Sequence, residues 1–204
     1  MQFLTDRDAL RSLYKAPGEK AVQKELAVLD RHAKAFIARS PFLLIGSSDG
    51  QGHSDVTPRG DRPGFVDILD DRTIAIPDRP GNNRLDTLEN VLANPAVGLL
   101  FLIPNMNETL RLNGIARITA DADLRVRLAV DGKQPTTVLV VAVQSVYMHC
   151  AKAFLRSNLW APESWPARSE MPTLGEILKD QIALAATAAE TDEALADAYA
   201  KTMW

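Results

Sequence analysis

The sequence TLRLNGIARIT, residues 109–119, alternates between apolar and polar side chains over most of its length. On an extended chain, Arg111, Asn113 and Arg117 fall on one face, and the other face carries Leu110, Leu112, Ala116 and Ile118. Successive side chains of a β-strand point to opposite faces of the sheet. The stretch therefore predicts a long strand with one buried side and one wet side.

Shorter apolar runs on both sides of this stretch predict further strands. They are separated by turn residues, such as SDGQG at 48–52 and DDR at 70–72, at spacings typical of hairpins. The pattern favours an antiparallel meander that is complete by Met148. The expected strands are 42–45, 53–57, 65–69, 73–76, 97–103 and 138–143.

Apolar residues at helical spacing frame these strands at both ends of the chain. Before the strands, Thr5 is expected to cap a short helix, and a longer helix is expected over 22–37. Shorter helices are expected over 85–92, 121–130 and 151–159, and a last one from Thr173 with a break at 190–192. The fold class is thus mainly β with flanking helices, a small antiparallel barrel of six to seven strands.

Composition narrows the classes of protein to which the chain can belong. Its 204 residues are 46% hydrophobic and carry a net charge of -3 at a pI near 5.6, which suits one domain and disfavours a nucleic-acid binder. The expected domain, 1–204, comprises N-terminal helices (1–40), the barrel (41–150) and a C-terminal helical extension (151–204). The sequence contains no apolar run long enough to predict a membrane span. Its single cysteine, Cys150, fits a reducing, cytoplasmic location.

Two segments about twenty positions apart combine arginine with hydroxyl or amide side chains. They are SDVTPRGD at 54–61 and PDRPGNNR at 77–84. Either segment alone is typical of an ordinary turn with solvated arginines. Because arginine suits phosphate oxygens and strand-end loops often bind ligands, the pair predicts a cradle for a phosphorylated cofactor.

Within these segments, the spacing indicates which side chains converge. Thr57 and Arg59 are placed to meet one ligand, with Pro58 stiffening the chain between them. Asn82, Asn83 and Arg84 directly precede the helix expected from Leu85, and a helix N-terminus favours an anion.

Motifs for metal binding, haem binding or catalysis by side chains are weak or lacking in the sequence. The three histidines are scattered and there is no paired-cysteine pattern, so no metal site is predicted. His149 stays open as a haem ligand, although a strand-end histidine is more often a packing residue. No esterase elbow or nucleotide-binding glycine motif is present, so any enzymatic reactivity is expected to come from a cofactor.

Ordered motifs across residues 20–162 resemble a subfamily of the pyridoxamine 5'-phosphate oxidase-like flavoproteins. The motifs are SPF (40–42), DVTPRGD (55–61), PGFV (63–66), PDRPGNNRLD (77–86), NP (94–95), GLLF (98–101), ETLR (108–111), NG (113–114), HCAKA (149–153), RS (156–157) and LW (159–160). The resemblance implies an FMN-binding split β-barrel that works as a homodimer with FMN between the subunits. The C-terminal arginine and tryptophan arrangement associated with true pyridoxamine phosphate oxidases is missing, which puts vitamin B6 oxidation in doubt.

The resemblance also implies a set of cofactor-binding residues. Thr57, Pro58 and Arg59 would lie beside the phosphate and ribityl chain, with Asn82, Asn83 and Arg84 completing the phosphate site. Ile76 and Pro77 would run along the flavin ring. From the other subunit, the resemblance implies Leu110 and Arg111 at the far edge of the ring, with Lys152, Arg156 and Trp160 closing the site.

The leading hypothesis is an FMN-dependent oxidoreductase of unknown substrate, in which no side chain is assigned as acid or base. One alternative is a flavin or haem binding protein without turnover. Another is a reductase that uses a deazaflavin. The sequence does not separate these three.

Overall fold

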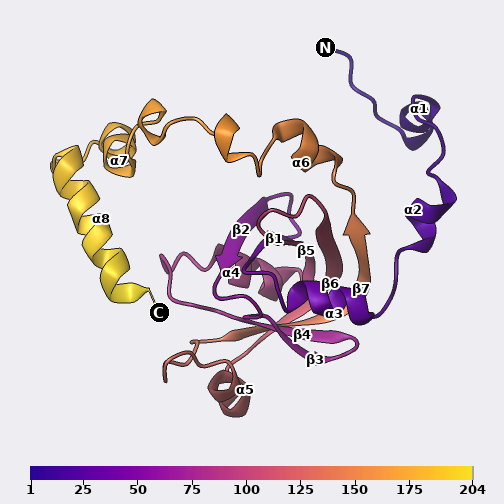
Figure 1. Ribbon diagram of the computed structural model, residues 1–204, viewed down its shortest axis with the longest axis horizontal. Coiled ribbons are helices and arrows are strands. Elements are labelled where there is room, and N and C mark those ends of the chain that lie inside the picture. Colours follow the sequence, from indigo (N-terminus) through magenta and orange to yellow (C-terminus); the bar gives the residue numbers. More distant parts are fainter. Residues whose placement is uncertain (204) are drawn as a thin grey trace.

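Seven strands form a single antiparallel sheet in the computed structural model, which describes residues 1–203 (Figure 1). Their order across the sheet is β2-β1-β5-β6-β7-β4-β3. The strands are β1 (Phe42–Ser48), β2 (Ser54–Gly60), β3 (Asp67–Asp70), β4 (Thr73–Pro77), β5 (Ala96–Leu102), β6 (Thr109–Thr119) and β7 (Val138–His149).

Strand β6 is the centre of this sheet and has the bounds that its alternating sequence predicts. It pairs with β5 on one side and with all of β7 on the other. The register between β6 and β7 shifts at Asn113/Gly114, which marks a bulge. Bulges bend a strand and increase its twist, so this one helps the sheet to curl.

The two end strands, β2 and β3, do not pair with each other, so within residues 1–203 the curled sheet stays open between them. This is the predicted split barrel with flanking helices, and its seven strands agree with the expected six to seven. The expectation of a simple meander was wrong. The β1–β2 and β3–β4 hairpins are consecutive in sequence but lie at opposite ends of the sheet, because β4 pairs with β7 and β1 pairs with β5.

The inner face of the sheet and two helices enclose the main core. Helix α3 (Arg31–Ile37) contributes Phe36 and Ile37, and α4 (Asp86–Ala93) contributes Leu88 and Val91. Burying each such side chain stabilises the fold by roughly 1.5–3 kcal/mol before conformational entropy is subtracted. The buried apolar residues of the described chain run from Leu29 to Val146.

The N-terminal helices differ from the predicted ones. Asp6, rather than Thr5, caps α1 (Arg7–Ser12) by accepting a hydrogen bond from the Ala9 N–H. The helix expected over 22–37 is divided into α2 (Glu19–Gln23) and α3, because Leu26 forms a bridge with Val146 through two backbone hydrogen bonds of 3.0 and 2.8 Å. Sheet pairing thus overrides the helical periodicity at this point.

Short helices follow the later strands. After α5 (Ala122–Arg127) and β7, the chain forms α6 (Lys152–Ser157), two 3-10 turns, η1 (Pro162–Ser164) and η2 (Arg168–Glu170), then α7 (Leu174–Ile182) and α8 (Ala188–Thr202). The break between the last two helices lies at 183–187 instead of 190–192, since Ala183 adopts a positive φ of 50° and Thr187 caps α8. Within residues 1–203, no helix combines the length and apolar character needed to cross a bilayer.

The close approach of β6 and β7 at the bulge generates a stability prediction. A Cβ at Gly114 would lie 2.4 Å from the Ala142 carbonyl oxygen, whereas one at Gly46 in the same sheet would lie 3.7 Å from its nearest neighbour. We expect Gly114→Ala to lower the free energy of unfolding by about 2–4 kcal/mol. Gly46→Ala is expected to change it by less than about 1 kcal/mol, as urea denaturation would measure. Equal stabilities of the two variants would contradict the bulge geometry.

Candidate functional site

Strand β2 brings three polar side chains onto one side of the sheet edge. Residues 55, 57 and 59 are partly buried while residues 54, 56, 58 and 60 are exposed, so Asp55, Thr57 and Arg59 share a face. The sequence predicted that this strand ends at Thr57 and that Pro58 and Arg59 follow it in a loop, but the strand continues to Gly60. Pro58 is tolerated within it because β2 is an edge strand.

The segment between β4 and α4 forms the second wall of the site. The Arg84 N–H donates to Asn82 Oδ1 at 3.1 Å, and both Asn83 and Leu85 have left-handed backbone conformations with φ of 57° and 61°. Helix α4 then begins without a side-chain cap. Its first N–H groups therefore have no capping side chain and carry the positive end of the helix dipole.

These two walls enclose a cavity of about 470 Å³. Five of the residues proposed from the sequence line it together: Thr57, Arg59, Asn82, Asn83 and Arg84. The start of α4, from Leu85 to Leu88, also lines it. A second cavity of about 360 Å³ shares Thr57, Arg59 and Asn82 with the first and adds Pro58 and Pro77. Segments that lie twenty positions apart in the sequence thus meet at one site.

Three ion pairs hold the arginines of these walls. Arg59 Nη1 donates to Asp78 Oδ1 at 2.5 Å, and both side chains are about four-fifths buried, with exposed fractions of 22% and 18%. Arg79 Nε donates to Asp61 Oδ2 at 2.7 Å, and its Nη1 donates to the Leu128 carbonyl at 2.9 Å. These two pairs fix the loop against β2 and against the end of α5.

The third pair is more open to solvent. Arg84 Nε donates to Asp86 Oδ2 at 2.7 Å, with 72% of the Arg84 side chain exposed. The hydrogen bond that Arg84 donates to Asp86, then the charges of Asp86 and Asp55, raise the pKa of Arg84. Exposed pairs of this kind contribute little stability, so Arg84 can exchange its carboxylate partner for another anion at low cost.

One polar atom in the site lacks a partner. Arg59 Nε is buried and makes no hydrogen bond within the described chain, although Nη1 of the same guanidinium is paired. A buried N–H without an acceptor costs about 1–3 kcal/mol. Together with the asparagine amides and the uncapped start of α4, this donor fits an anion with several acceptor oxygens, such as a phosphate.

Sequence reasoning missed the carboxylates of the site. Asp55, Asp78 and Asp86 all line the larger cavity, and Asp55 Oδ2 accepts a hydrogen bond from Thr87 Oγ1 at 3.0 Å. A bound phosphate must therefore share its arginines with them. The sequence signal that could have identified these aspartates is their position inside or beside the two arginine segments.

The other proposed residues fall into two groups, one beside Arg59 and one in separate parts of the chain. Ile76 is buried and, with Pro77 and Arg59, borders a gap of about 10 Å³. Leu110 is buried in a separate groove, and Arg111 Nη1 donates to Tyr147 Oη at 3.0 Å. Lys152, Arg156 and Trp160 lie on or after α6, and none of these last five residues lines the two arginine cavities. The sequence assigned these five to the other subunit, and that assignment stays a prediction.

Metal-binding clusters are lacking in the same region. Across residues 1–203, no three His, Cys, Asp or Glu side chains gather in a way that could hold a metal ion. His149, the proposed haem ligand, pairs with Thr109 at the end of the sheet and lines neither arginine cavity.

Residues 29–150 match the sequence profile of pyridoxamine 5'-phosphate oxidase. The chain belongs to the pyridoxamine 5'-phosphate oxidase family. The match spans both arginine segments and all seven strands, and no curated protein matches the chain.

Solved structures with low sequence identity resemble the fold. HupZ from Group A Streptococcus is 14% identical, with a TM-score of 0.49 over 59% of this chain and 93% of its own. An FMN-binding protein from Syntrophomonas wolfei is 13% identical, with a TM-score of 0.46 over 58% and 84%. A Clostridium acetobutylicum protein related to general stress protein 26, of the pyridoxinephosphate oxidase family, is 15% identical, with a TM-score of 0.43 over 58% and 85%.

The unequal burial of the ion pairs generates a second stability prediction. Asp78→Ala leaves the charge of Arg59 unpaired in a mostly buried position, so we expect it to lower the free energy of unfolding by about 1–3 kcal/mol. Asp86→Ala removes the partner of an exposed arginine and is expected to change it by less than about 1 kcal/mol. Urea denaturation of both variants measures the difference. The reverse ranking would contradict the burial of the Arg59–Asp78 pair.

Proposed function

We propose that this family member binds FMN, with the terminal phosphate in the arginine cavity. The observation that carries the proposal is the convergence of Thr57, Arg59, Asn82, Asn83 and Arg84 on one cavity, where Arg59 Nε is buried without an acceptor. A phosphate dianion offers acceptor oxygens to Arg59 and Arg84 together. Membership of the family supports a flavin over other phosphorylated ligands.

The remaining predicted residues are proposed to bind the rest of the cofactor. Pro58, Ile76 and Pro77 border the smaller cavity or the gap beside Arg59, in line with a position beside the ribityl chain and the ring. Because five of the predicted residues line neither arginine cavity in their own chain, we propose that a second copy supplies them in a homodimer. These are Leu110, Arg111, Lys152, Arg156 and Trp160.

We further propose that the protein is a cytoplasmic FMN-dependent oxidoreductase whose 204 residues act as one domain. Bound FMN supplies the capacity to accept and release a hydride or electrons. The chain itself binds and orients the cofactor. Arg111, which is fixed by its hydrogen bond to Tyr147, is suited to stabilise negative charge at the edge of a ring held by the partner.

The phosphate site can be tested through cofactor affinity. Arg59→Ala and Arg84→Ala should each weaken FMN binding roughly 10- to 100-fold, because each removes charge-assisted hydrogen bonds. Arg62→Ala is the matched control, since Arg62 is 75% exposed, pairs with Asp131 and lines neither arginine cavity. Flavin fluorescence titration measures all three, and far-UV circular dichroism checks their folding.

Riboflavin separates binding of the phosphate from binding of the ring. The parent protein should prefer FMN to riboflavin, and Arg59→Ala with Arg84→Ala should reduce this preference. Equal affinity of the parent protein for the two flavins would exclude a phosphate cradle. A protein that binds neither flavin would refute the proposed cofactor.

Turnover requires a separate measurement. The FMN-loaded protein should lose its oxidised flavin absorbance on anaerobic addition of NADH or NADPH, and should regain it when an acceptor such as oxygen is added. Free FMN at the same concentration is the control. A bound flavin that neither donor reduces would favour a flavin-binding protein over a nicotinamide-dependent oxidoreductase.

A further inference from the structure

The two ends of the chain extend from opposite sides of the barrel and lie outside the family match. In Figure 1, α1 and α2 lie on the right, while α7 and α8 lie on the left and away from the sheet. The apolar core of the described residues ends at Val146, so the C-terminal helices do not bury apolar side chains against the barrel.

Helices α7 and α8 nevertheless form a defined hairpin. The Gly175 N–H donates to Asp192 Oδ1 at 2.7 Å, and a Cβ at Gly175 would lie only 2.3 Å from the Ala188 carbonyl oxygen. Both helices start with capping boxes, Thr173 with Glu176 and Thr187 with Glu190. These contacts specify the arrangement of two helices that touch each other closely.

Three large apolar side chains of the hairpin are exposed to solvent. Leu174, Ile182 and Tyr199 are 42%, 61% and 54% exposed. Helices of nine and fifteen residues are marginal in water unless an apolar face packs on another element. The hairpin therefore needs a docking surface that its own barrel does not supply.

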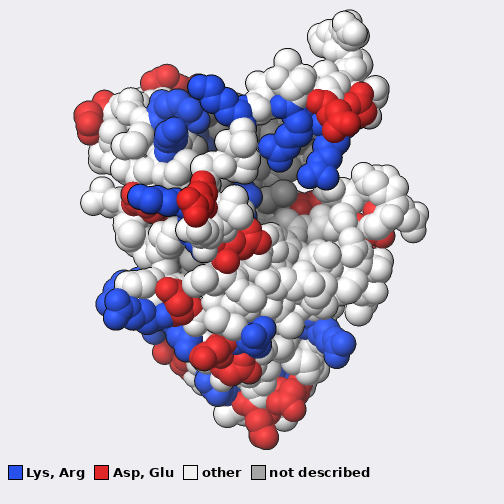
Figure 2. Space-filling view, turned by 90° about the vertical axis from the view of Figure 1, so that its right-hand side faces the viewer, with Lys and Arg blue, Asp and Glu red and all other residues white. Residues whose placement is uncertain are grey.

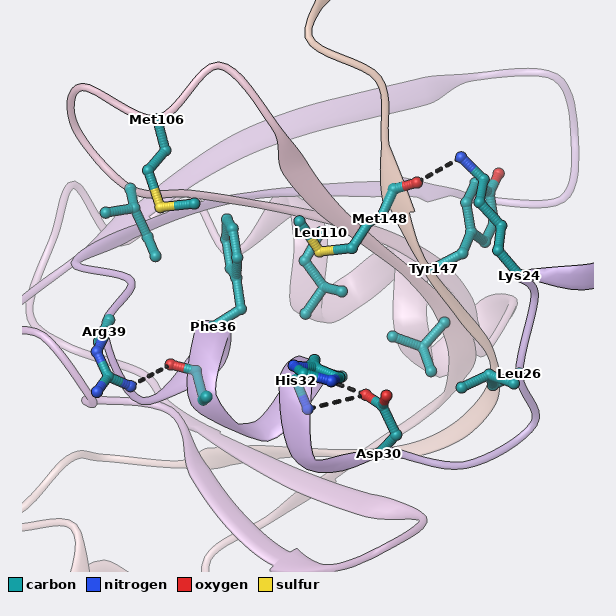
Figure 3. A pocket seen from close by; sticks show the side chains of 14 residues that line it. Lys24, Leu26, Asp30, His32, Phe36, Arg39, Met106, Leu110, Tyr147 and Met148 are labelled. Atoms are coloured by element: carbon teal, nitrogen blue, oxygen red, sulfur yellow. Dashed lines mark hydrogen bonds between the residues drawn. The ribbon is translucent and has the colours of Figure 1, made fainter. Parts of the chain in front are cut away.

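An apolar groove of about 710 Å³ lies between α3 and the strands β6 and β7 (Figure 3). Figure 3 shows Phe36 of α3 facing Met106 and Met148, with Leu110 between the strands behind them. Methionine side chains adapt to the shape of a partner and are frequent at protein-binding surfaces. The groove is open rather than enclosed and suits side chains that project from a helix.

Charge distinguishes the rim of the groove from the hairpin. Lys24 and Arg39 lie at opposite ends of the groove, and the carboxylate of Asp30 is engaged by the N–H groups of His32 and Ala33. Residues 173–203 contain six carboxylates and only two lysines: Glu176, Asp180, Glu190, Asp192, Glu193, Asp197, Lys179 and Lys201. The two surfaces are complementary in both apolar character and charge.

Figure 2 shows charges of both signs over the wider surface on the side of α1 and α2, with several lysine and arginine side chains beside a hollow in its upper half. Complementary charge between two surfaces favours their encounter and fixes the register of a docked element.

We propose that the α7–α8 hairpin of one copy docks in the apolar groove of a second copy. The path of the chain favours a second copy over the hairpin's own groove. Trp160 Nε1 donates to the Met106 carbonyl at 2.8 Å and its ring stacks on Phe154, which ties the connecting segment to the groove's own rim. Beyond this anchor, the chain carries α7 and α8 to the left of the barrel and away from α3 (Figure 1).

Charge reversal tests the proposal with two complementary variants. K24E/R39E makes the rim of the groove acidic, and D180K/D197K replaces one exposed carboxylate by lysine in each helix of the hairpin and leaves both capping boxes intact. Each variant alone should lose at least about tenfold of the hydrogen-exchange protection of residues 173–202, because like charges then face each other. An equimolar mixture should recover that protection, since each groove then meets a hairpin of opposite charge.

Two controls separate loss of docking from a general effect of the charge changes. R62E/R117E makes the same change of charge on exposed residues outside the groove and should leave hairpin protection unchanged. The unaltered protein should show protected hairpin amides. A hairpin that exchanges freely in the unaltered protein, or a mixture that recovers nothing, would overturn the proposal.

Disulfide trapping identifies the copy that supplies the hairpin. In a Cys150→Ser background, copies with Ile182→Cys and differently tagged copies with Met106→Cys are mixed and oxidised. A cross-link between the two tags is expected. In a second experiment, a chain that carries both substitutions is diluted in cysteine-free copies and oxidised. If it then forms only a disulfide within its own chain, the second-copy proposal is wrong.

A small amphipathic ligand is the competing occupant of the groove. Dodecanoate serves as the probe, because its tail suits the apolar floor and its carboxylate suits Lys24 or Arg39. In the proposed arrangement, dodecanoate competes with the hairpin and lowers its protection. Tight binding of dodecanoate with the hairpin protection unchanged would assign the groove to a ligand and overturn the proposal.

Discussion

The pairing of β6 with both of its neighbours is the constraint on which the rest of the structure depends. Through β5 and β7, this one strand connects the two hairpins that form the ends of the sheet. The extra residue of the bulge lies in β7, opposite Asn113/Gly114, and Gly114 of β6 allows the Ala142 carbonyl to approach more closely than any side chain would permit. A sheet curled in this way brings β2 near the end of β4, although the two strands never pair.

The arginine cavity follows from that curvature. Edge strand β2 supplies Thr57 and Arg59, while the segment after β4 supplies Asn82 to Arg84. The Arg59–Asp78 ion pair joins the two walls at a mostly buried position, and Arg84 remains at the open side. The site therefore combines one fixed guanidinium with one that can change its partner, which suits a ligand that enters from solvent.

Much of this arrangement could be predicted from the sequence where local pattern and tertiary structure agree. The alternation over 109–119 gave the bounds of β6, and the two arginine segments indicated residues that share a cavity. Prediction failed where distant contacts override local preference. The bridge between Leu26 and Val146 interrupts a helical pattern, and β2 continues through Pro58 because Leu44 and Leu43 of β1 pair with it there. The carboxylates of the cavity were missed because nothing in the linear sequence shows that Asp78 faces Arg59.

Pro58 has a consequence beyond the binding site. An exposed strand edge is a template on which another polypeptide can add a strand, and this is a common route to aggregation. Proline has no N–H, and it is tolerated in edge strands where that missing donor would point away from the sheet. Pro58 therefore makes the edge of the sheet beside Arg59 a poorer template for an added strand. The residue that lines the cavity wall thus also disfavours polymerisation through this edge.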